Sequence, residues 1–328
     1  MKTRVYGTLG PQCCTQERIA HMFEMGMCGM RLNLSHVSLQ DSQDWLNVFR
    51  AAAQKAGVQA ELLIDMKGPE LRIGVIDPAL TLQPEDVVVL GKDIPVEEKV
   101  REQLLISDQI LLDDGKILLD VIGVDEHLIT CKVVRPGVLT SKKSLAVVGR
   151  SLDMPVLTES DVQNLKHAKE FGVTGIMQPF VRTKEDLMAL RKELEMLDCG
   201  DLRVFAKIEN EEGFRNLESL LPYCDEIIVA RGDLANSVGL VNVICIQYQI
   251  EDICKRCGKE YMIVTQMLDS MISKPVPTRA EVSDVYGAVY RGCHSIMLTG
   301  ETAGGKYPEE AMQYFTDVAK VAESGQML

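Results

Sequence analysis

The feature of this chain that most restricts its fold is a regular alternation of short apolar segments with longer helical ones. Eight of the short segments have the aliphatic, β-branched composition of buried strands. A parallel strand needs a crossover connection, usually a helix, before the next strand can pair with it. The alternation therefore predicts a closed (β/α)8 TIM barrel, with an open doubly wound sheet as the alternative. The predicted strands cover residues 3–8, 29–34, 61–65, 174–178, 203–208, 226–230, 262–265 and 295–299.

Capping residues mark where several of the predicted helices begin and end. Thr158, with Asp161 three residues later, is typical of a helix start, and Gly172 is predicted to end that helix. Glycine is a common stop because it adopts the left-handed conformation without a steric penalty. Other helices are predicted to end at Gly26, Gly57, Gly258 and Gly292.

The interval from the third strand to the next clear helix breaks the alternation. Residues 75–150 contain short β-type segments, and Asp114-Gly115 between two apolar runs is typical of a hairpin turn. They contain no Phe, Tyr or Trp, so they lack the stacking surface that binders of single-stranded nucleic acid use. We therefore expect residues 75–150 to form a small β domain inserted into a barrel made of residues 1–74 and 151–328.

The overall charge excludes some classes of protein. The chain has 35 Lys and Arg against 48 Asp and Glu, a formal charge of −13, which disfavours general binding to nucleic acid. No stretch approaches the ~18 apolar residues of a membrane span, and the first residues lack the apolar core of a signal peptide, so we expect a cytoplasmic protein. The ten cysteines are scattered and are expected to be reduced thiols.

The residues that follow the predicted strands indicate the chemistry. In a TIM barrel these residues meet at the carboxyl ends of the strands, where active sites are built. Several of them are cationic, which suits a small anionic substrate such as a phosphate. These cations are Arg31, Lys67, Arg72, Lys207 and Arg231.

Glu209 and Asp233 end adjacent predicted strands, so their carboxylates could hold one divalent ion, for which Mg2+ is the best fit. A ring of ion pairs that seals the barrel end is the alternative. Lys207 directly follows an apolar run, and beside a metal it could neutralise a phosphoryl group or an enolate oxygen. The residues alone thus reach a magnesium-dependent barrel enzyme for a phosphorylated or carboxylated substrate, but no specific reaction.

At these residues the sequence resembles the pyruvate kinase family. The matching stretches follow one another along the whole barrel, and two further segments resemble the family's small β-barrel lid domain, inserted after the third strand. The barrel stretches are RLNLSH (31–36), KGPELRIG (67–74), AKIENEEG (206–213), IIVARGDL (227–234), VTQMLDSMISKPVPTRAEVSD (264–284) and IMLTGETAGGKYP (296–308). The lid stretches are LLDDGK (111–116) and SKKS (141–144).

The resemblance implies transfer of phosphate from phosphoenolpyruvate to ADP, giving pyruvate and ATP. Arg31 and Lys207 would contact the transferring phosphoryl group. Glu209 and Asp233 would hold Mg2+ or Mn2+. The backbone at Gly232 and Asp233 and the hydroxyl of Thr265 would receive the substrate carboxylate, with Thr265 near the face where the enolate is protonated.

The resemblance also implies a potassium site and a nucleotide side. Asn33, Ser35, Asp65 and the carbonyl of Met66 would surround K+. His36, Arg72 and Lys142 would lie beside the nucleotide. Two departures from the family pattern concern this part of the protein, a shorter lid and the sequence Ala146-Val-Val-Gly149 after the lysine pair.

The family continues with a C-terminal domain, whereas this sequence ends at Leu328. The resemblance therefore implies a short form without the allostery of that domain, in which a homodimer would use barrel surfaces. Two other functions remain open at this stage. One is a metal-dependent lyase or decarboxylase acting on pyruvate or oxaloacetate enolates, and the other is a non-catalytic protein that binds a phosphorylated ligand.

Overall fold

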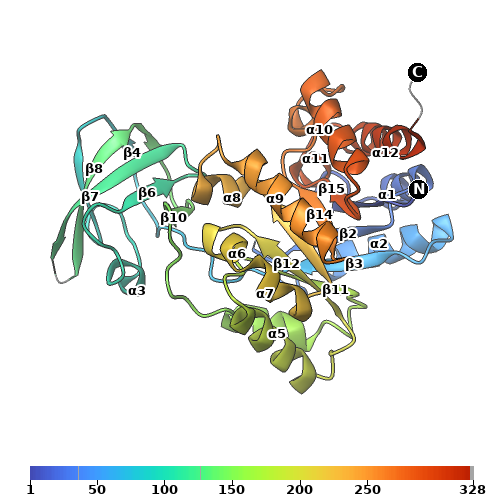
Figure 1. The fold of residues 1–328 in the computed structure, drawn as a ribbon, viewed down its shortest axis with the longest axis horizontal. Coiled ribbons are helices and arrows are strands. Elements are labelled where there is room, and N and C mark those ends of the chain that lie inside the picture. Colours follow the sequence, from blue (N-terminus) through green and yellow to red (C-terminus); the bar gives the residue numbers. More distant parts are fainter. Residues whose placement is uncertain (36, 126, 326–328) are drawn as a thin grey trace.

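The structure is a computed structural model that describes residues 1–35, 37–125 and 127–325. Its main feature is a closed barrel of eight parallel strands with helices around it (Figure 1). Going round the barrel, the strands are β1 (Arg4–Thr8), β15 (Ser295–Met297), β14 (Glu260–Val264), β13 (Glu226–Ala230), β12 (Arg203–Ile208), β11 (Gly175–Gln178), β3 (Glu61–Asp65) and β2 (Gly29–Asn33). Because β1 pairs with both β15 and β2, the predicted TIM barrel is confirmed and the open sheet was wrong.

The helices that cover the barrel have amphipathic sequences whose apolar faces pack on the strands. The longer ones are α1 (Gln16–Met25), α2 (Gln43–Ala56), α4 (Glu159–Lys166), α5 (Lys184–Met196), α9 (Val243–Arg256), α10 (Arg279–Tyr290) and α12 (Pro308–Ser324). Short helices at the loops are α6 (Glu211–Arg215), α7 (Leu217–Leu220), α8 (Arg231–Val238) and α11 (Gly300–Ala303), with 3-10 turns at Leu221–Tyr223 and Asp269–Ile272. Within the described residues, no helix combines the length and apolar composition of a membrane span.

The predicted helix boundaries are correct at most of the positions named. Thr158 and Asp161 form a capping box at the start of α4. The predicted end of that helix at Gly172 was wrong, because α4 ends at Lys166. The next amides, of His167 and Ala168, bond the carbonyls three residues back, so the chain tightens into turns before it reaches Gly172.

The interior of the barrel is filled by a second apolar cluster. Its buried members include Tyr6, Met177, Phe205, Met262 and Met297, which project inward from five different strands. The barrel is therefore a packed core and not a channel, and the cavity described below opens above it, at the carboxyl ends of the strands.

The residues between β3 and α4 form two antiparallel sheets on one side of the barrel (Figure 1). The larger sheet has the order β10 (Leu145–Val147), β6 (Gln109–Leu112), β7 (Ile117–Asp125), β8 (Leu128–Arg135) and β5 (Val87–Leu90). The smaller pairs β4 (Leu80–Leu82) with β9 (Gly137–Leu139), and the short helix α3 is Glu98–Arg101. A separate apolar cluster fills this part of the chain.

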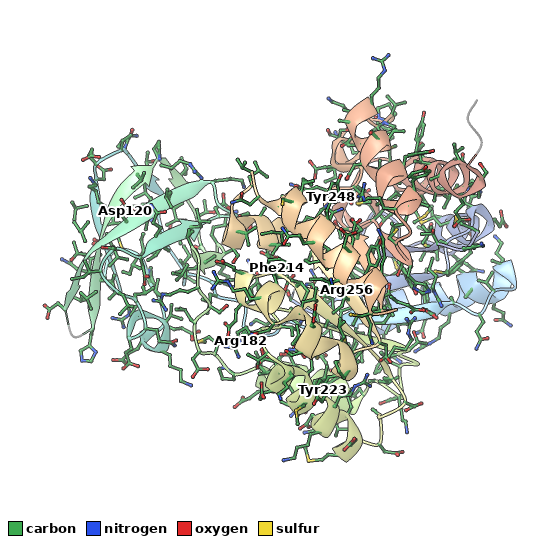
Figure 2. All side chains as sticks on the ribbon, in the orientation of Figure 1. Asp120, Arg182, Phe214, Tyr223, Tyr248 and Arg256 are labelled. Carbon is green, nitrogen blue, oxygen red and sulfur yellow. The ribbon has the colours of Figure 1, made fainter. Side chains whose placement is uncertain are left out.

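One detail of this segment corrects the sequence prediction. In the described residues the expected small β barrel is an open five-stranded sheet plus a separate pair, because no pairing joins β5 to β10. The predicted hairpin at Asp114-Gly115 is confirmed, since β6 and β7 pair and both residues have positive φ. Arg182, labelled in Figure 2, donates to the carbonyls of Leu152 and Met154 and so fixes the returning chain to the barrel.

An ion-pair network closes the amino ends of the strands, opposite the cavity. The Arg203 guanidinium on β12 contacts Glu226 of β13 at 3.1 Å and Glu260 of β14 at 3.0 Å. His294, just before β15, contacts Glu260 at 3.1 Å through Nε2 and lies 3.5 Å from Glu226 through Nδ1. The Glu226 carboxylate beside Nδ1, with that of Glu260, raises the pKa of His294 against the opposing effect of burial.

Candidate active site

The carboxyl ends of the strands surround a cavity of about 540 Å3, a volume suited to a small ligand. Seven of the barrel strands, or the segments that follow them, contribute polar side chains to its lining. These side chains are Thr8, Arg31, Asn33, Asp65, Lys207, Glu209, Asp233, Thr265 and Thr299. The arrangement follows from topology, because parallel strands in a barrel bring their carboxyl ends to one face.

Asp65, at the end of β3, joins the two cations of this cavity. Its Oδ2 accepts from Arg31 Nε at 2.7 Å and lies 2.6 Å from Arg31 Nη2. Lys207 Nζ lies 3.3 Å from both carboxylate oxygens. Burial opposes ionisation of Asp65, which is 2% exposed, but Lys207 and Arg31 outweigh it and hold the pKa of Asp65 below its usual value.

Lys207 is also bound to a second carboxylate, that of Glu209, which directly follows its strand β12. Its Nζ lies 2.9 Å from Glu209 Oε1, and burial, which favours the neutral amine, is outweighed by Asp65 and Glu209. The pKa of Lys207 is therefore raised, and the side chain carries a fixed positive charge in the cavity. The other carboxylate oxygen of Glu209 accepts from the backbone N–H of Phe180 at 2.7 Å.

Asp233 is the one acidic side chain of the cavity that its surroundings do not neutralise. Among the described residues, none forms a hydrogen bond or salt bridge with its carboxylate. Asp233 keeps an exposed surface, but it lies deep between the barrel and the sheets of residues 75–150 and lines three adjoining hollows. This enclosure and the negative charge of Glu209 raise the pKa of Asp233, while water in the hollows still reaches it.

Glu209 and Asp233 together fit a divalent cation. Glu209 directly follows β12, Asp233 lies in the first turn of α8 after the neighbouring strand β13, and both line the cavity. A cation between them would remove the repulsion that raises the pKa of Asp233, and oxygen donors of this type suit Mg2+ or Mn2+. The alternative of a sealing ring of ion pairs explains Glu209, which is bound to Lys207, but it leaves Asp233 without a partner.

Thr265 and Gly232 meet across the loops after β14 and β13. The backbone N–H of Gly232 donates to Thr265 Oγ1 at 3.0 Å, and that hydroxyl donates to the carbonyl of Val264 at 2.7 Å. Thr265 has φ 68° and Gln266 has φ 52°, so the chain leaves the strand through two left-handed residues. The predicted strand ended at Thr265. This turn explains why β14 ends one residue earlier, at Val264.

Asn33, Ser35, Asp65 and Met66, the four residues predicted to surround K+, lie together at the ends of β2 and β3. Asn33 pairs directly with Asp65 in the sheet, and its Oδ1 accepts from the N–H of Ser35 at 3.2 Å. Met66 directly follows Asp65 and is buried. These four residues are thus neighbours in the sheet or in the chain, although Asp65 is also engaged by Arg31 and Lys207.

Of the three residues predicted on the nucleotide side, the structure brings two together. Arg72 Nη1 donates to the carbonyl of Lys142 at 2.9 Å, and Arg72 Nη2 lies 2.6 Å from Glu70. Both Arg72 and Lys142 are exposed at the junction of the barrel and the sheets of residues 75–150. The third, His36, lies outside the described residues.

The predicted convergence of five cations was wrong in part. Only Arg31 and Lys207 line the cavity, whereas Lys67 is exposed to solvent and Arg72 is paired with Glu70. Arg231 is buried and binds Asp284 through two hydrogen bonds of 2.9 and 2.7 Å. Position after a strand predicts which end of the barrel a residue occupies, but not the partner that its side chain selects.

Two features of the site have no signal in the sequence. One is the N–H of Phe180 that fixes Glu209, which depends on a left-handed backbone at Phe180 with φ 51°. The other is the pairing of Arg231 with Asp284, which are far apart in the chain. Asp284 is the last residue of one of the stretches that resemble the family, but the resemblance does not indicate that Arg231 is its partner.

Comparison with known proteins matches the whole barrel. A family model described as "Pyruvate kinase, barrel domain" covers residues 1–312. The chain is 36% identical to "Pyruvate kinase" of Bacillus licheniformis over 98% of its own length and 57% of that protein. It is 36% identical to "Pyruvate kinase 2" of Trypanosoma brucei brucei and 33% identical to "Pyruvate kinase" of Chlamydia muridarum, with 98% of this chain covered each time. The chain spans 67% and 69% of those two relatives, so all three are longer.

Proposed function

The chain belongs to the pyruvate kinase family, and we propose that it transfers the phosphoryl group of phosphoenolpyruvate to ADP, giving pyruvate and ATP. The observation that carries this proposal is the convergence of Arg31, Lys207, Glu209 and Asp233 on one cavity. Phosphoryl transfer depends mainly on positioning and charge stabilisation, and these four side chains supply both cationic groups and metal ligands. The comparisons do not favour the lyase or the non-catalytic binder.

In this proposal Arg31 and Lys207 hold the phosphoryl group. Asp65 binds both side chains, so their positive charges are already held in place in the cavity before the substrate binds. A preorganised cation stabilises the developing charge without reorganising solvent during the reaction. Glu209 and Asp233 hold Mg2+ or Mn2+, which when bound neutralises phosphate and carboxylate oxygens of the substrate.

The Gly232 N–H and the Thr265 hydroxyl receive the substrate carboxylate. They lie 3.0 Å apart and are at present bonded to each other, so a carboxylate oxygen would take the place of this internal hydrogen bond. The N–H of Gly232 belongs to the first turn of α8, where backbone donors are unpaired and favour an anion. Thr265 also lies where a proton could be delivered to the enolate.

The remaining parts of the proposal concern ions, nucleotide and assembly. Asn33, Ser35, Asp65 and the Met66 carbonyl bind K+, and His36, Arg72 and Lys142 contact the nucleotide. Residues 75–150 form a lid domain over a barrel of residues 1–74 and 151–328, with Asp233 at their junction. A cytoplasmic location in glycolysis and a homodimer through barrel surfaces belong to the same proposal.

A coupled assay tests the function. Pyruvate formation from phosphoenolpyruvate and ADP is measured with Mg2+, with and without K+. Lys207→Met is expected to lower kcat by about 10²–10³-fold or more, on the scale of one preorganised electrostatic donor. Lys259→Met is the matched control, because Lys259 bonds the carbonyl of Cys224 at the other end of the barrel. Absence of turnover above the Lys207→Met background would overturn the proposal.

A further inference from the structure

Arg231 begins α8 directly after β13, two residues before the proposed metal ligand Asp233. Its side chain is buried and uses all three guanidinium nitrogens. Nε and Nη2 donate to the carbonyl of Thr265 at 3.2 and 2.7 Å, and Nη2 also lies 3.3 Å from the carbonyl of Gln266. Nη1 donates to both carboxylate oxygens of Asp284 on α10.

The carbonyls bound by Arg231 belong to the two left-handed residues after β14. A left-handed backbone is unfavourable at a residue with a Cβ, and here two such residues follow each other. Such a turn persists only where its surroundings favour it over other conformations. The Arg231 guanidinium supplies that bias, because it binds the carbonyl oxygens of Thr265 and Gln266 only when they turn toward it.

The turn determines where the Thr265 hydroxyl lies. Thr265 lines the cavity together with Lys207 and Asp233, and its Oγ1 accepts from the N–H of Gly232, the residue after Arg231. Adjacent residues of α8 thus hold both sides of Thr265, Arg231 its carbonyl and Gly232 its hydroxyl. A shift of the carbonyl would move the hydroxyl as well.

We propose that Arg231 and Asp284 are positioning residues that act through Thr265. The pair holds the left-handed turn so that the Thr265 hydroxyl meets the substrate carboxylate and the enolate. This inference rests on the proposed function, because it assigns a role within the same site. Asp284 neutralises the buried guanidinium through Nη1 alone, while Nε and Nη2 bind the carbonyl of Thr265. Lysine has a single nitrogen and cannot reach both partners in this planar geometry.

The kinetic test is a double-mutant cycle of Arg231→Lys and Thr265→Ala. Misplacement of a reacting group by about 1 Å costs up to ~10²-fold, so Arg231→Lys is expected to lower kcat about 10–10²-fold. In the Thr265→Ala background the same change should lower kcat less than about threefold, since the group that it positions is gone. Asp284→Asn should also lower kcat, although it leaves the donors of Arg231 in place.

Arg291→Lys is the matched control for loss of an arginine fork. Arg291 binds Glu251 through Nε at 2.7 Å and Nη2 at 3.2 Å, at the end of α10 where it directly precedes the turn into β15. The Arg291→Lys variant should keep the wild-type kcat. Melting temperatures of all variants identify any that fail to fold, and Asp284→Asn then replaces Arg231→Lys in the cycle.

Binding of oxalate with Mn2+ supplies a readout that does not need turnover. Oxalate is a planar dianion that resembles the pyruvate enolate, and loss of a hydrogen bond to a charged group should weaken its binding about tenfold in Thr265→Ala. Arg231→Lys should weaken it only when Thr265 is present. If the wild type shows no turnover, the proposed function fails, and the oxalate cycle still tests the positioning. The positioning role would be overturned if the effects of the two substitutions multiply independently. It would also be overturned if Arg231→Lys keeps the wild-type kcat and oxalate affinity.

Discussion

Asp65 carries the strongest test of how the cavity is built. It is almost completely buried and is bound by two cations, Arg31 at 2.6–2.7 Å and Lys207 at 3.3 Å. The substitution Asp65→Asn keeps the size of the side chain but leaves both cations without their shared counter-charge. Removing one partner of a buried ion pair costs about 3–5 kcal/mol, because the remaining charge is buried and uncompensated.

The expected shift in melting temperature follows from the length of the chain. At about 2.1 cal/mol/K per residue, 328 residues give an unfolding entropy of about 0.7 kcal/mol/K, so a loss of 3–5 kcal/mol lowers Tm by about 4–7 °C. Calorimetry at pH 7.5 measures it, with Asp317→Asn as the control. Asp317 forms an exposed pair with Lys320, which contributes less than about 1 kcal/mol.

The lowered pKa of Asp65 also predicts how the loss of stability in Asp65→Asn depends on pH. The pKa of Asp65 is lowered in the folded protein, so its stabilisation is present above the unfolded value of 3.8 and is lost as pH falls through the folded pKa. The difference in Tm between wild type and Asp65→Asn should therefore be constant from pH 8 to pH 5. A Tm of Asp65→Asn within about 1 °C of the wild type at pH 7.5 would refute the claim that Asp65 neutralises both cations.

Two further predictions concern the proposed metal ligands and the opposite end of the barrel. Glu209→Gln and Asp233→Asn should each weaken Mn2+ binding, followed by electron paramagnetic resonance, by at least about tenfold, and unchanged affinity would contradict the assigned site. The raised pKa of His294 means that its ion pairs stabilise the fold fully below the unfolded value of 6.5 and lose that effect as pH rises through the folded pKa. The Tm difference between wild type and His294→Gln should thus shrink from pH 6 to pH 9, and a difference that grows over this range would be inconsistent with its contacts to Glu226 and Glu260.

The barrel could be predicted from sequence because its strands are short apolar runs between helices with clear caps. The same logic placed Asn33, Asp65, Lys207 and Glu209 together, since a residue at the end of a parallel strand has only one face to occupy. Strand ends were less accurate where the backbone becomes left-handed, as at Thr265. The positive φ of Thr265 has no local sequence signature, because the surrounding structure imposes it.

The sequence could not predict features that depend on partners distant in the chain. Arg231 was expected among the cations that meet at the carboxyl ends of the strands, but Asp284, 53 positions later, binds it. The strands β4, β9 and β10 of the inserted segment have only three residues each, so a period-2 pattern over them is too short to indicate a strand. Their pairing also decided that residues 75–150 form two sheets, in place of the small barrel that was expected.

Phosphorus NMR of a mixture of phosphoenolpyruvate, ADP, Mg2+ and K+ tests the central claim most directly. It follows donor and acceptor in one sample, so it separates transfer from hydrolysis and from lyase chemistry. Transfer in the cavity of Arg31 and Lys207 predicts that each phosphoenolpyruvate lost yields one ATP, and that Lys207→Met suppresses both changes. Loss of phosphoenolpyruvate with release of inorganic phosphate, or ATP formation at an unchanged rate in Lys207→Met, would contradict it.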